Sequence, residues 1–359
     1  MGRTVSNSIK DAAKPKKKKK KNKLYVPTGS TLLNLKLSGT PDGGFQSGSM
    51  ANVIGDSSAG KTFTALTMLA ECANDPRFDS YDLIYDDAEH RNSFDVCRLF
   101  GDKFHKRVKP PGGFTKTGRP INSKYLPEFQ DHLNDRFDKN KKMIYVLDSF
   151  DSLTTIEDEE QYEKEREARA KGKEVSGSYG MYKAKAASAL FRQITSKLSE
   201  TDSLLVVVSQ TRANIGLGFS PKTRSGGAAL KFYSDHELWL AVVETLKKSD
   251  TPIGVKSRIK ITKNSVTGQI RQTNIQIYYD YGIDDITANI EYLMSQKTFK
   301  KLTKATFTCP ELDFKAGTKQ SLVKHVEEND LEQALVDIVV DVDEAFEDSL
   351  KLKRKGKYS

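Results

Sequence analysis

The chain has 359 residues, of which 37% are hydrophobic and 30% charged, enough for one large α/β domain plus a smaller unit, or for two domains. No stretch approaches the roughly 20 apolar residues of a membrane span, and no apolar run follows the charged N-terminus, so we expect neither membrane insertion nor secretion. Three scattered cysteines, Cys72, Cys97 and Cys309, argue against a disulfide framework or a metal-binding spacing and favour a reducing cytoplasm.

The net charge of +10 is concentrated in two tails. Residues 1–25 carry ten Lys or Arg and one Asp, and residues 351–359 carry five basic residues and no acidic one, so the body is mildly acidic. We expect residues 1–23 and 351–359 to be disordered, because a run such as Lys16 to Lys21 repels itself. The lysine run has three interpretations: a solubilising tail, an arm that binds phosphate backbone without reading sequence, or a nuclear address.

Strands and helices alternate along the chain from Leu24 onward. Short apolar runs predict strands at Met50–Ile54, Asp82–Asp86, Met143–Leu147, Ser203–Ser209, Leu238–Val243, Ser257–Thr262 and Gln269–Tyr279. Helical patterns predict helices at Thr62–Asn74, Ser93–Phe100, Leu126–Asp138 and Met181–Ser199. Residues 24–285 should therefore form a mostly parallel, twisted sheet with helices on both faces, and residues 286–350 a small C-terminal α/β unit.

A glycine-rich motif follows the first long strand and precedes a helix, as a phosphate-binding loop must. Its glycines let backbone N–H groups close around phosphate oxygens, and the helix N-terminus adds its dipole. Lys61 would lie against the β- and γ-phosphates, and the Thr62 hydroxyl would bind Mg²⁺. The residues that we expect to hold the nucleotide are Gly55, Asp56, Ser57, Ser58, Ala59, Gly60, Lys61 and Thr62.

Acidic residues follow two more predicted strands. Asp148 ends an apolar strand, in the arrangement that helps to hold Mg²⁺ beside a phosphate loop. Glu89 follows another strand end, and a carboxylate there could deprotonate the water that attacks the γ-phosphate. Asp86 and Asp87 are rivals for this role by spacing alone. The edge at which strands end is also where α/β sheets bind their ligands.

A neutral amide, Gln210, ends the fourth strand, where it could hydrogen-bond the γ-phosphate. The glycine-rich segment that follows contains Arg212, Lys222 and Arg224. A loop with such cations fits a contact with single-stranded nucleic acid, and its alternative is an ordinary solvated loop.

Taken in order, these motifs resemble the RecA-type recombinase family. The segment Tyr85–His90 looks like that family's strand ending in Asp-Ala-Glu-His, and Ser209–Phe219 with Ser225–Tyr233 is similar to its second DNA-binding loop. The resemblance covers roughly residues 30–282 and looks closest to the phage-encoded UvsX-like branch. It implies a RecA-like core that binds ATP and Mg²⁺, in the cytoplasm of a host cell if the protein is phage-encoded.

The resemblance also implies a role for individual residues. Glu89 would activate water, Gln210 would sense the γ-phosphate, and Lys263 would reach the γ-phosphate bound by a neighbouring subunit. Gly180 would lie near a first DNA loop. Residues that would face DNA are Arg212, Phe219, Lys222, Arg224, Gly226 and Gly227. Ser265 departs from the family, which has a second lysine at that position, and residues 1–23 lack the apolar stripe of the family's N-terminal docking helix.

Three functions remain open from the sequence. The first is a DNA-dependent ATPase that coats single-stranded DNA as a filament and promotes pairing and strand exchange with a homologous duplex. The second keeps the fold but acts as a ring helicase, a helicase loader or a strand-annealing protein. The third is a non-catalytic binding module. Expected partners are single- and double-stranded DNA and further copies of the chain, with single-strand-binding and loader proteins as further candidates and no membrane.

Overall fold

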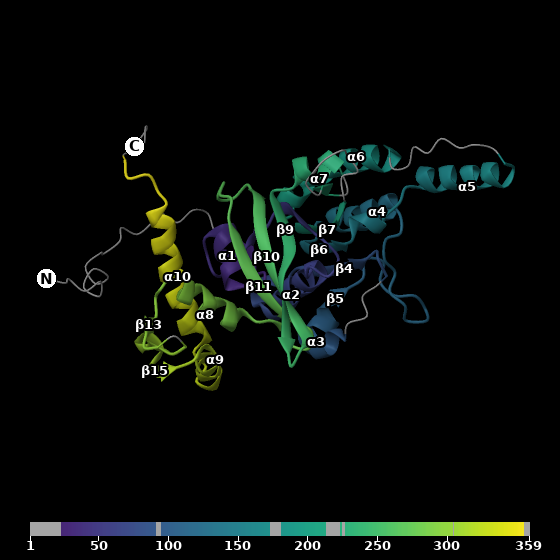
Figure 1. The fold of residues 1–359 in the computed structure, drawn as a ribbon. Coiled ribbons are helices and arrows are strands. Elements are labelled where there is room, and N and C mark those ends of the chain that lie inside the picture. Colours follow the sequence, from purple (N-terminus) through teal and green to yellow (C-terminus); the bar gives the residue numbers. More distant parts are fainter. Residues whose placement is uncertain are drawn as a thin grey trace.

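The computed structural model describes residues 23–90, 95–172, 181–212, 223–224, 227–303 and 305–354 (Figure 1). The predicted disorder of the basic tails falls mostly outside these ranges. Among the helices within them, none combines the length and the apolar character needed to cross a membrane.

A large mixed sheet forms the centre of the molecule. Across the sheet the order is β12 (Gly282–Ile283), β11 (Gln272–Tyr278), β10 (Thr251–Asn264), β9 (His236–Lys248), β3 (Ser49–Gly55), β7 (Leu204–Arg212), β6 (Met143–Asp148), β4 (Asp82–Asp87) and β5 (Val108–Lys109), with β8 (Thr223–Arg224) paired to the end of β7. Neighbours from β9 to β5 are parallel, whereas β10, β11 and β12 extend the sheet in antiparallel fashion. The predicted α/β class with a parallel centre is confirmed.

Helices cover both faces of this sheet, because its central strands are apolar on both sides. On β6, Ile144 and Val146 pack with α2 (Lys61–Asn74) and α3 (Val96–Arg107). The alternate residues Tyr145 and Leu147 pack on the opposite face with α4 (Leu126–Phe137), α6 (Met181–Glu200) and α7 (Gly227–Tyr233). Two hydrophobic layers therefore fix the strands, as a continuous apolar run in a parallel sheet predicts.

Two elements differ from their predicted bounds. Helix α3 was expected at Ser93–Phe100, but it begins at Val96 and continues past a non-helical Gly101 to Arg107. Strands β9 and β10 are much longer than the predicted segments and form one hairpin. Ser249 and Asp250 connect them, both with positive φ, as the tightest hairpin turns require.

The C-terminal unit combines three helices with a small sheet. Its elements are α8 (Asp285–Ser295), β13 (Lys300–Lys301), β14 (Phe307–Cys309), β15 (Phe314–Gly317), α9 (Lys319–Glu328) and α10 (Glu332–Ser349). Figure 1 shows this unit beside β11, at the end of the molecule away from α5 (Ile156–Ala170). Its hydrophobic cluster includes Leu32 and Leu35 of α1 (Thr31–Ser38), so helix α1 packs against both the central sheet and the C-terminal unit. The domain boundary at residue 285 stays a prediction.

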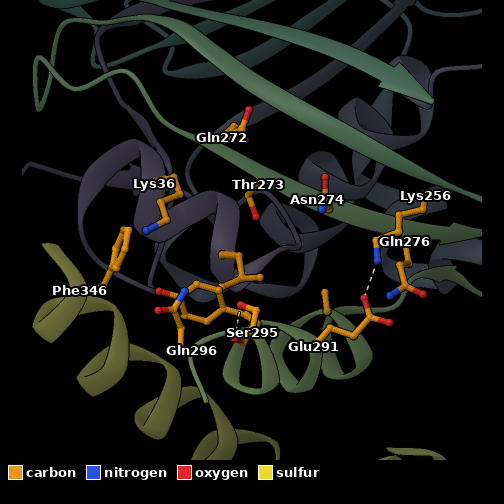
Figure 2. A pocket seen from close by; sticks show the side chains of 13 residues that line it. Lys36, Lys256, Gln272, Thr273, Asn274, Gln276, Glu291, Ser295, Gln296 and Phe346 are labelled. Carbon is orange, nitrogen blue, oxygen red and sulfur yellow. Dashed lines mark hydrogen bonds and ion pairs between the residues drawn. The ribbon is translucent and has the colours of Figure 1, made fainter. Parts of the chain in front are cut away.

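Charged groups also join α1 to the C-terminal unit. Lys36 is 7% exposed and pairs with Asp343 and, at 3.2 Å, with Glu347 of α10. Figure 2 shows the adjoining cavity of about 460 Å³, where Lys256 of β10 contacts Glu291 of α8 at 2.7 Å. A buried charge is tolerated only when it is paired, so the contacts of Lys36 favour one position of α10 against the core.

Candidate active site

The phosphate loop connects the buried strand β3 to helix α2. Space requires its first glycine, because a Cβ on Gly55 would lie 2.6 Å from the Leu240 carbonyl oxygen, whereas a Cβ on Gly60 would lie 2.4 Å from only the end of the Ile277 side chain, which can move. Gly60 also has a φ of 87°. Among the described residues no side chain caps the N-terminus of α2, so its first N–H groups are available to an anion.

Lys61 begins α2 and is 8% exposed. Its ammonium donates a hydrogen bond to the Asp56 carbonyl oxygen at 2.7 Å, so the side chain folds back over the loop. Burial lowers the pKa of Lys61, while Asp148 and Glu89 act in the opposite direction. A buried ammonium held among carboxylates is suited to bind a phosphate chain.

Thr62 and Asp148 meet at the place predicted for Mg²⁺. The Thr62 hydroxyl donates to Asp148 Oδ2 at 2.6 Å, and the Tyr85 hydroxyl approaches the same oxygen at 3.3 Å. Burial raises the pKa of Asp148 to about 6, which leaves the carboxylate mainly ionised at neutral pH. One hydroxyl and one carboxylate fit Mg²⁺, which takes few protein ligands and keeps oxygens of water and nucleotide.

Glu89 lies where the ends of three parallel strands come together. Its carboxylate Oε1 accepts hydrogen bonds from Ser149 Oγ at 2.6 Å and from Gln210 Nε2 at 2.9 Å. Its backbone N–H donates to the Asp148 carbonyl oxygen at 3.2 Å. Residues just after β4 and β6 and near the end of β7 thus orient one carboxylate beside the phosphate loop.

Gln210 is fixed at both its main chain and its side chain. The backbone N–H donates to Asp151 Oδ2 at 2.7 Å, while the side chain holds Glu89. The next residue, Thr211, donates its hydroxyl to Asp56 of the phosphate loop. The end of β7 therefore contacts both the nucleotide loop and the candidate base.

A cavity of about 560 Å³ collects these groups. Lys61, Thr62, Glu89 and Asp148 line its polar part, and its remaining lining residues are Ser57, Ser58, Gly60, Phe63, Tyr85, Asp87, Val255, Ile277 and Tyr279. The size and mixed lining suit a small organic ligand with charged groups at one end.

Three of the lining residues, Val255, Ile277 and Tyr279, lie on or beside the antiparallel strands β10 and β11. The sequence analysis assigned them no role, because no motif joins them to the phosphate loop. The aromatic pair Tyr278-Tyr279 at the end of a predicted strand is the one signal that could have drawn notice.

Of the two rivals to Glu89, Asp87 lines the cavity, but Asp86 points to the other face of the sheet. Asp86 is fully buried and accepts hydrogen bonds from the Ser123 N–H at 2.8 Å, the Ser123 hydroxyl at 2.6 Å and the Tyr145 hydroxyl at 2.7 Å. These contacts make Asp86 a structural carboxylate and remove it as a candidate base.

We expect Asp86→Ala to lower the free energy of unfolding by about 2–4 kcal/mol, since three buried donors lose their acceptor. Chemical denaturation would measure the loss. Asp82→Ala, at a half-buried position of the same strand, is the matched control and should change stability by less than about 1 kcal/mol. Equal effects in the two variants would contradict the structural role of Asp86.

Lys263 lies near the end of β10 and does not line the cavity at the phosphate loop. In the strand register, Lys263 is opposite Glu237 near the start of β9, whereas Gly55 is opposite Leu240 farther along the same strand. Its ammonium donates to the carbonyl oxygens of Lys231 at 3.1 Å and Phe232 at 2.9 Å. Lys263 is therefore not part of the cavity formed by its own chain.

The predicted DNA-facing residues are only partly described. Phe219, Lys222 and Gly226, with Gly180 of the first loop, lie outside the described residues. Arg212 ends β7, Arg224 belongs to β8 and Gly227 begins α7. Strand β8 pairs with Thr211 and Arg212 at the end of β7, so a short antiparallel pairing lies directly after Gln210.

Parts of this chain are similar in sequence to known proteins. A family model described as the RecA N-terminal domain matches residues 166–284. Protein RecA of Colwellia psychrerythraea is 25% identical over 338 residues, which are 92% of this chain and 89% of that protein. Protein RecA of Streptomyces coelicolor is 29% identical over 259 residues, which are 72% of this chain and 61% of that protein.

The chain thus spans less than two thirds of the Streptomyces relative, although it spans most of the Colwellia one. The family model includes β7 with Gln210, the loop after it and both strands of the long hairpin. In sequence, the chain is therefore similar to RecA proteins, and most strongly so where the family model matches, over residues 166–284.

Proposed function

We propose that this chain is a DNA-dependent ATPase that binds single-stranded DNA as a filament and promotes homologous pairing and strand exchange. Such a protein serves recombination, repair and recombination-dependent replication. The observation that carries the proposal is the hydrogen bond between Gln210 and Glu89 at 2.9 Å. It joins the candidate base for ATP hydrolysis to the residue that leads into the candidate DNA loop.

ATP with Mg²⁺ is the cofactor that the site fits. Residues Gly55 to Thr62 would hold the phosphates, and Thr62 and Asp148 would bind Mg²⁺, which neutralises charge on the phosphate oxygens. Glu89 would take the proton of the attacking water. The Gln210 side chain would release Glu89 and donate a hydrogen bond to the γ-phosphate instead. The end of β7 would transmit that movement to Arg212.

DNA would lie against the loop between β7 and α7. Arg212, Lys222 and Arg224 would neutralise backbone phosphates, Phe219 would offer a stacking surface, and Gly226 and Gly227 would let the backbone approach closely. The lysine-rich tail, residues 1–23, would add contacts with double-stranded DNA through release of counterions.

Assembly into a filament would complete the active site. Lys263 lies away from its own phosphate loop, so it could reach a γ-phosphate only on a neighbouring copy. Beside it, the Phe232 ring is 74% exposed, although its backbone carbonyl accepts a hydrogen bond from Lys263. An exposed aromatic ring next to a group that must meet the neighbour is a natural interface contact.

We expect Phe232→Ala to raise the protein concentration needed for assembly by about tenfold or more, because burying an aromatic ring contributes about 1.5–3 kcal/mol. Light scattering at a series of protein concentrations would measure the shift. Leu302→Ala, an exposed apolar position in the C-terminal unit, should leave assembly unchanged. A Phe232 variant that assembles like the unaltered protein would remove this face from the proposed interface.

The finer assignment is to the UvsX-like branch of the family. An identity of 25–29% to the bacterial proteins is low enough for a separate branch. Ser265 also stands where the RecA-type family has the second of its two lysines. Proteins that bind single strands or load the filament would then be further partners, in the cytoplasm of a host cell.

The proposal is tested by ATP hydrolysis with and without single-stranded DNA, with the same samples viewed by negative-stain electron microscopy. Stimulated hydrolysis together with helical filaments is the expected result. Stimulated hydrolysis with rings would instead indicate a ring helicase or a related RecA-fold ATPase. Absence of both stimulation and assembly would overturn the recombinase proposal.

A further inference from the structure

A cavity of about 460 Å³ lies where the central sheet meets the C-terminal unit (Figure 2). Strands β10 and β11 form one wall, and helices α1, α8 and α10 form the others. The cavity shares no lining residue with the one at the phosphate loop, and its volume falls in the range of small-molecule sites. The ATPase chemistry proposed above does not use it, so its polar lining needs a separate explanation.

One lining residue, Gln276 of β11, is buried without a partner for its amide nitrogen. The residue is 3% exposed, and among the described residues Gln276 Nε2 has no hydrogen-bond partner. An unpaired buried donor is costly, so native structures normally supply it with an acceptor. Because Gln276 lines the cavity, a molecule bound there could provide that acceptor.

An excess of positive charge lies at the same end of the cavity. Lys256, opposite Gln276 in the strand register, donates to Glu291 Oε2 at 2.7 Å, and Lys319 donates to Glu291 Oε1 at 2.6 Å. Burial raises the pKa of Glu291, but the hydrogen bonds from the two lysines outweigh it and leave that pKa below its ordinary value. Two ammonium groups therefore face one ionised carboxylate. An ammonium has three N–H donors, so Lys256 can serve a second acceptor while it keeps Glu291.

The other end of the cavity has aromatic rings and no charge in excess. Figure 2 shows Lys36 and Phe346 at this end, away from Lys256. The Lys36 ammonium lies 5.3 Å from the centre of the Phe346 ring and 5.8 Å from that of Tyr292. It pairs with two carboxylates of α10, and Arg271 pairs with one of the same two. Two positive and two negative charges cancel, so this end offers rings but no net charge to an anion.

We propose that this cavity binds a small organic anion, with a carboxylate or phosphate group at one end and a flat, apolar body at the other. The acidic group accepts hydrogen bonds from Gln276 Nε2 and Lys256, and the body lies against Tyr292 and Phe346. An inorganic anion would satisfy the first two residues alone, and an uncharged ring the last two alone. The inference does not depend on the proposed function, because none of these residues was assigned to ATP or DNA.

Phenyl phosphate and benzoate are the probes, because each joins one acidic group to one ring, and together they distinguish phosphate from carboxylate recognition. Isothermal titration measures their binding to the full chain without ATP or DNA. Inorganic phosphate and benzyl alcohol are the comparison compounds, and each lacks one of the two contacts. We expect at least one probe to bind about tenfold more tightly than either comparison compound. Failure of both probes to bind at millimolar concentrations would overturn the proposal.

Four variants locate the binding. Gln276→Met and Lys256→Met should each weaken it by about tenfold or more, since each removes a donor to a charged group. Lys260→Met, at an exposed position of β10 outside the cavity, and Lys61→Ala, in the phosphate loop, should bind the probe like the unaltered protein. A matching loss in Lys260→Met, or a loss in Lys61→Ala, would place the probe elsewhere and overturn the site.

The thermal stability of Gln276→Met gives an independent test. This variant should keep or raise the Tm of the free protein, because it removes a buried donor that has no partner. A clear fall in Tm would show that the amide already has its acceptor within the fold, which would overturn the role of Gln276. ATP hydrolysis enters none of these measurements, so a failure here leaves the proposed function untouched.

Discussion

Glu89→Gln is expected to lower kcat for ATP hydrolysis by about 10²- to 10⁴-fold, the range that general base catalysis contributes. The amide keeps the shape of the carboxylate and an oxygen that can still accept from Ser149 and Gln210, but it cannot take a proton from water. Binding of ATP and of single-stranded DNA should remain. Steady-state phosphate release and equilibrium binding of a fluorescent ATP analogue would measure the two properties separately.

Asp87→Asn is the matched control, because Asp87 also lines the cavity. It should retain much more activity than Glu89→Gln. If Glu89→Gln hydrolyses ATP at the normal rate while Asp87→Asn does not, the base is Asp87 and the assignment of Glu89 is wrong.

Lys61→Ala is expected to abolish detectable nucleotide binding, and hydrolysis with it. Lys61 is the buried cation of the phosphate loop, and its removal takes away the side-chain positive charge that faces the phosphates beside Asp148 and Glu89. Charge-assisted hydrogen bonds to phosphate are among the strongest in proteins, so a loss in affinity of at least about 10²-fold should follow. Isothermal titration with ATP and Mg²⁺ would measure it.

Lys141→Ala provides the control, because Lys141 is an exposed lysine on the loop before β6. It should bind ATP normally, and both variants should keep the Tm of the unaltered protein within a few degrees. Unchanged ATP affinity in Lys61→Ala would show that the glycine-rich loop does not hold the phosphates.

Local motifs made the centre of the fold predictable. The phosphate loop needs a strand before it and a helix after it, and β3 and α2 have these positions. The apolar runs at β6 and β7 were recognised because strands buried on both faces are continuous in hydrophobicity. The full length of β9 was not predicted because Glu244 to Lys248 are mostly polar and exposed, and that of β10 because Pro252 and Gly254 interrupt its first half.

The candidate site was predictable where chemistry follows a strand end directly. Glu89, Asp148 and Gln210 fall on neighbouring strands, and parallel strands bring their ends to one edge. Asp86 could have been rejected as a candidate base from the alternation of side chains along β4, which places it on the face opposite to Tyr85 and Asp87. Ile277 and Tyr279 could not be foreseen, because only the antiparallel pairing of β10 and β11 brings them to the phosphate loop.

The separation of Lys263 from the phosphate loop has an arithmetic consequence. If each complete catalytic centre takes its loop from one copy and its lysine from the next, an open row of n copies contains n − 1 centres, and a closed ring of n copies contains n. Turnover per copy would then rise with the length of the row and level off, with the greatest deficit in the shortest rows. An isolated copy would carry one phosphate loop and one Lys263, but the two would not meet, so it would contain no complete catalytic centre.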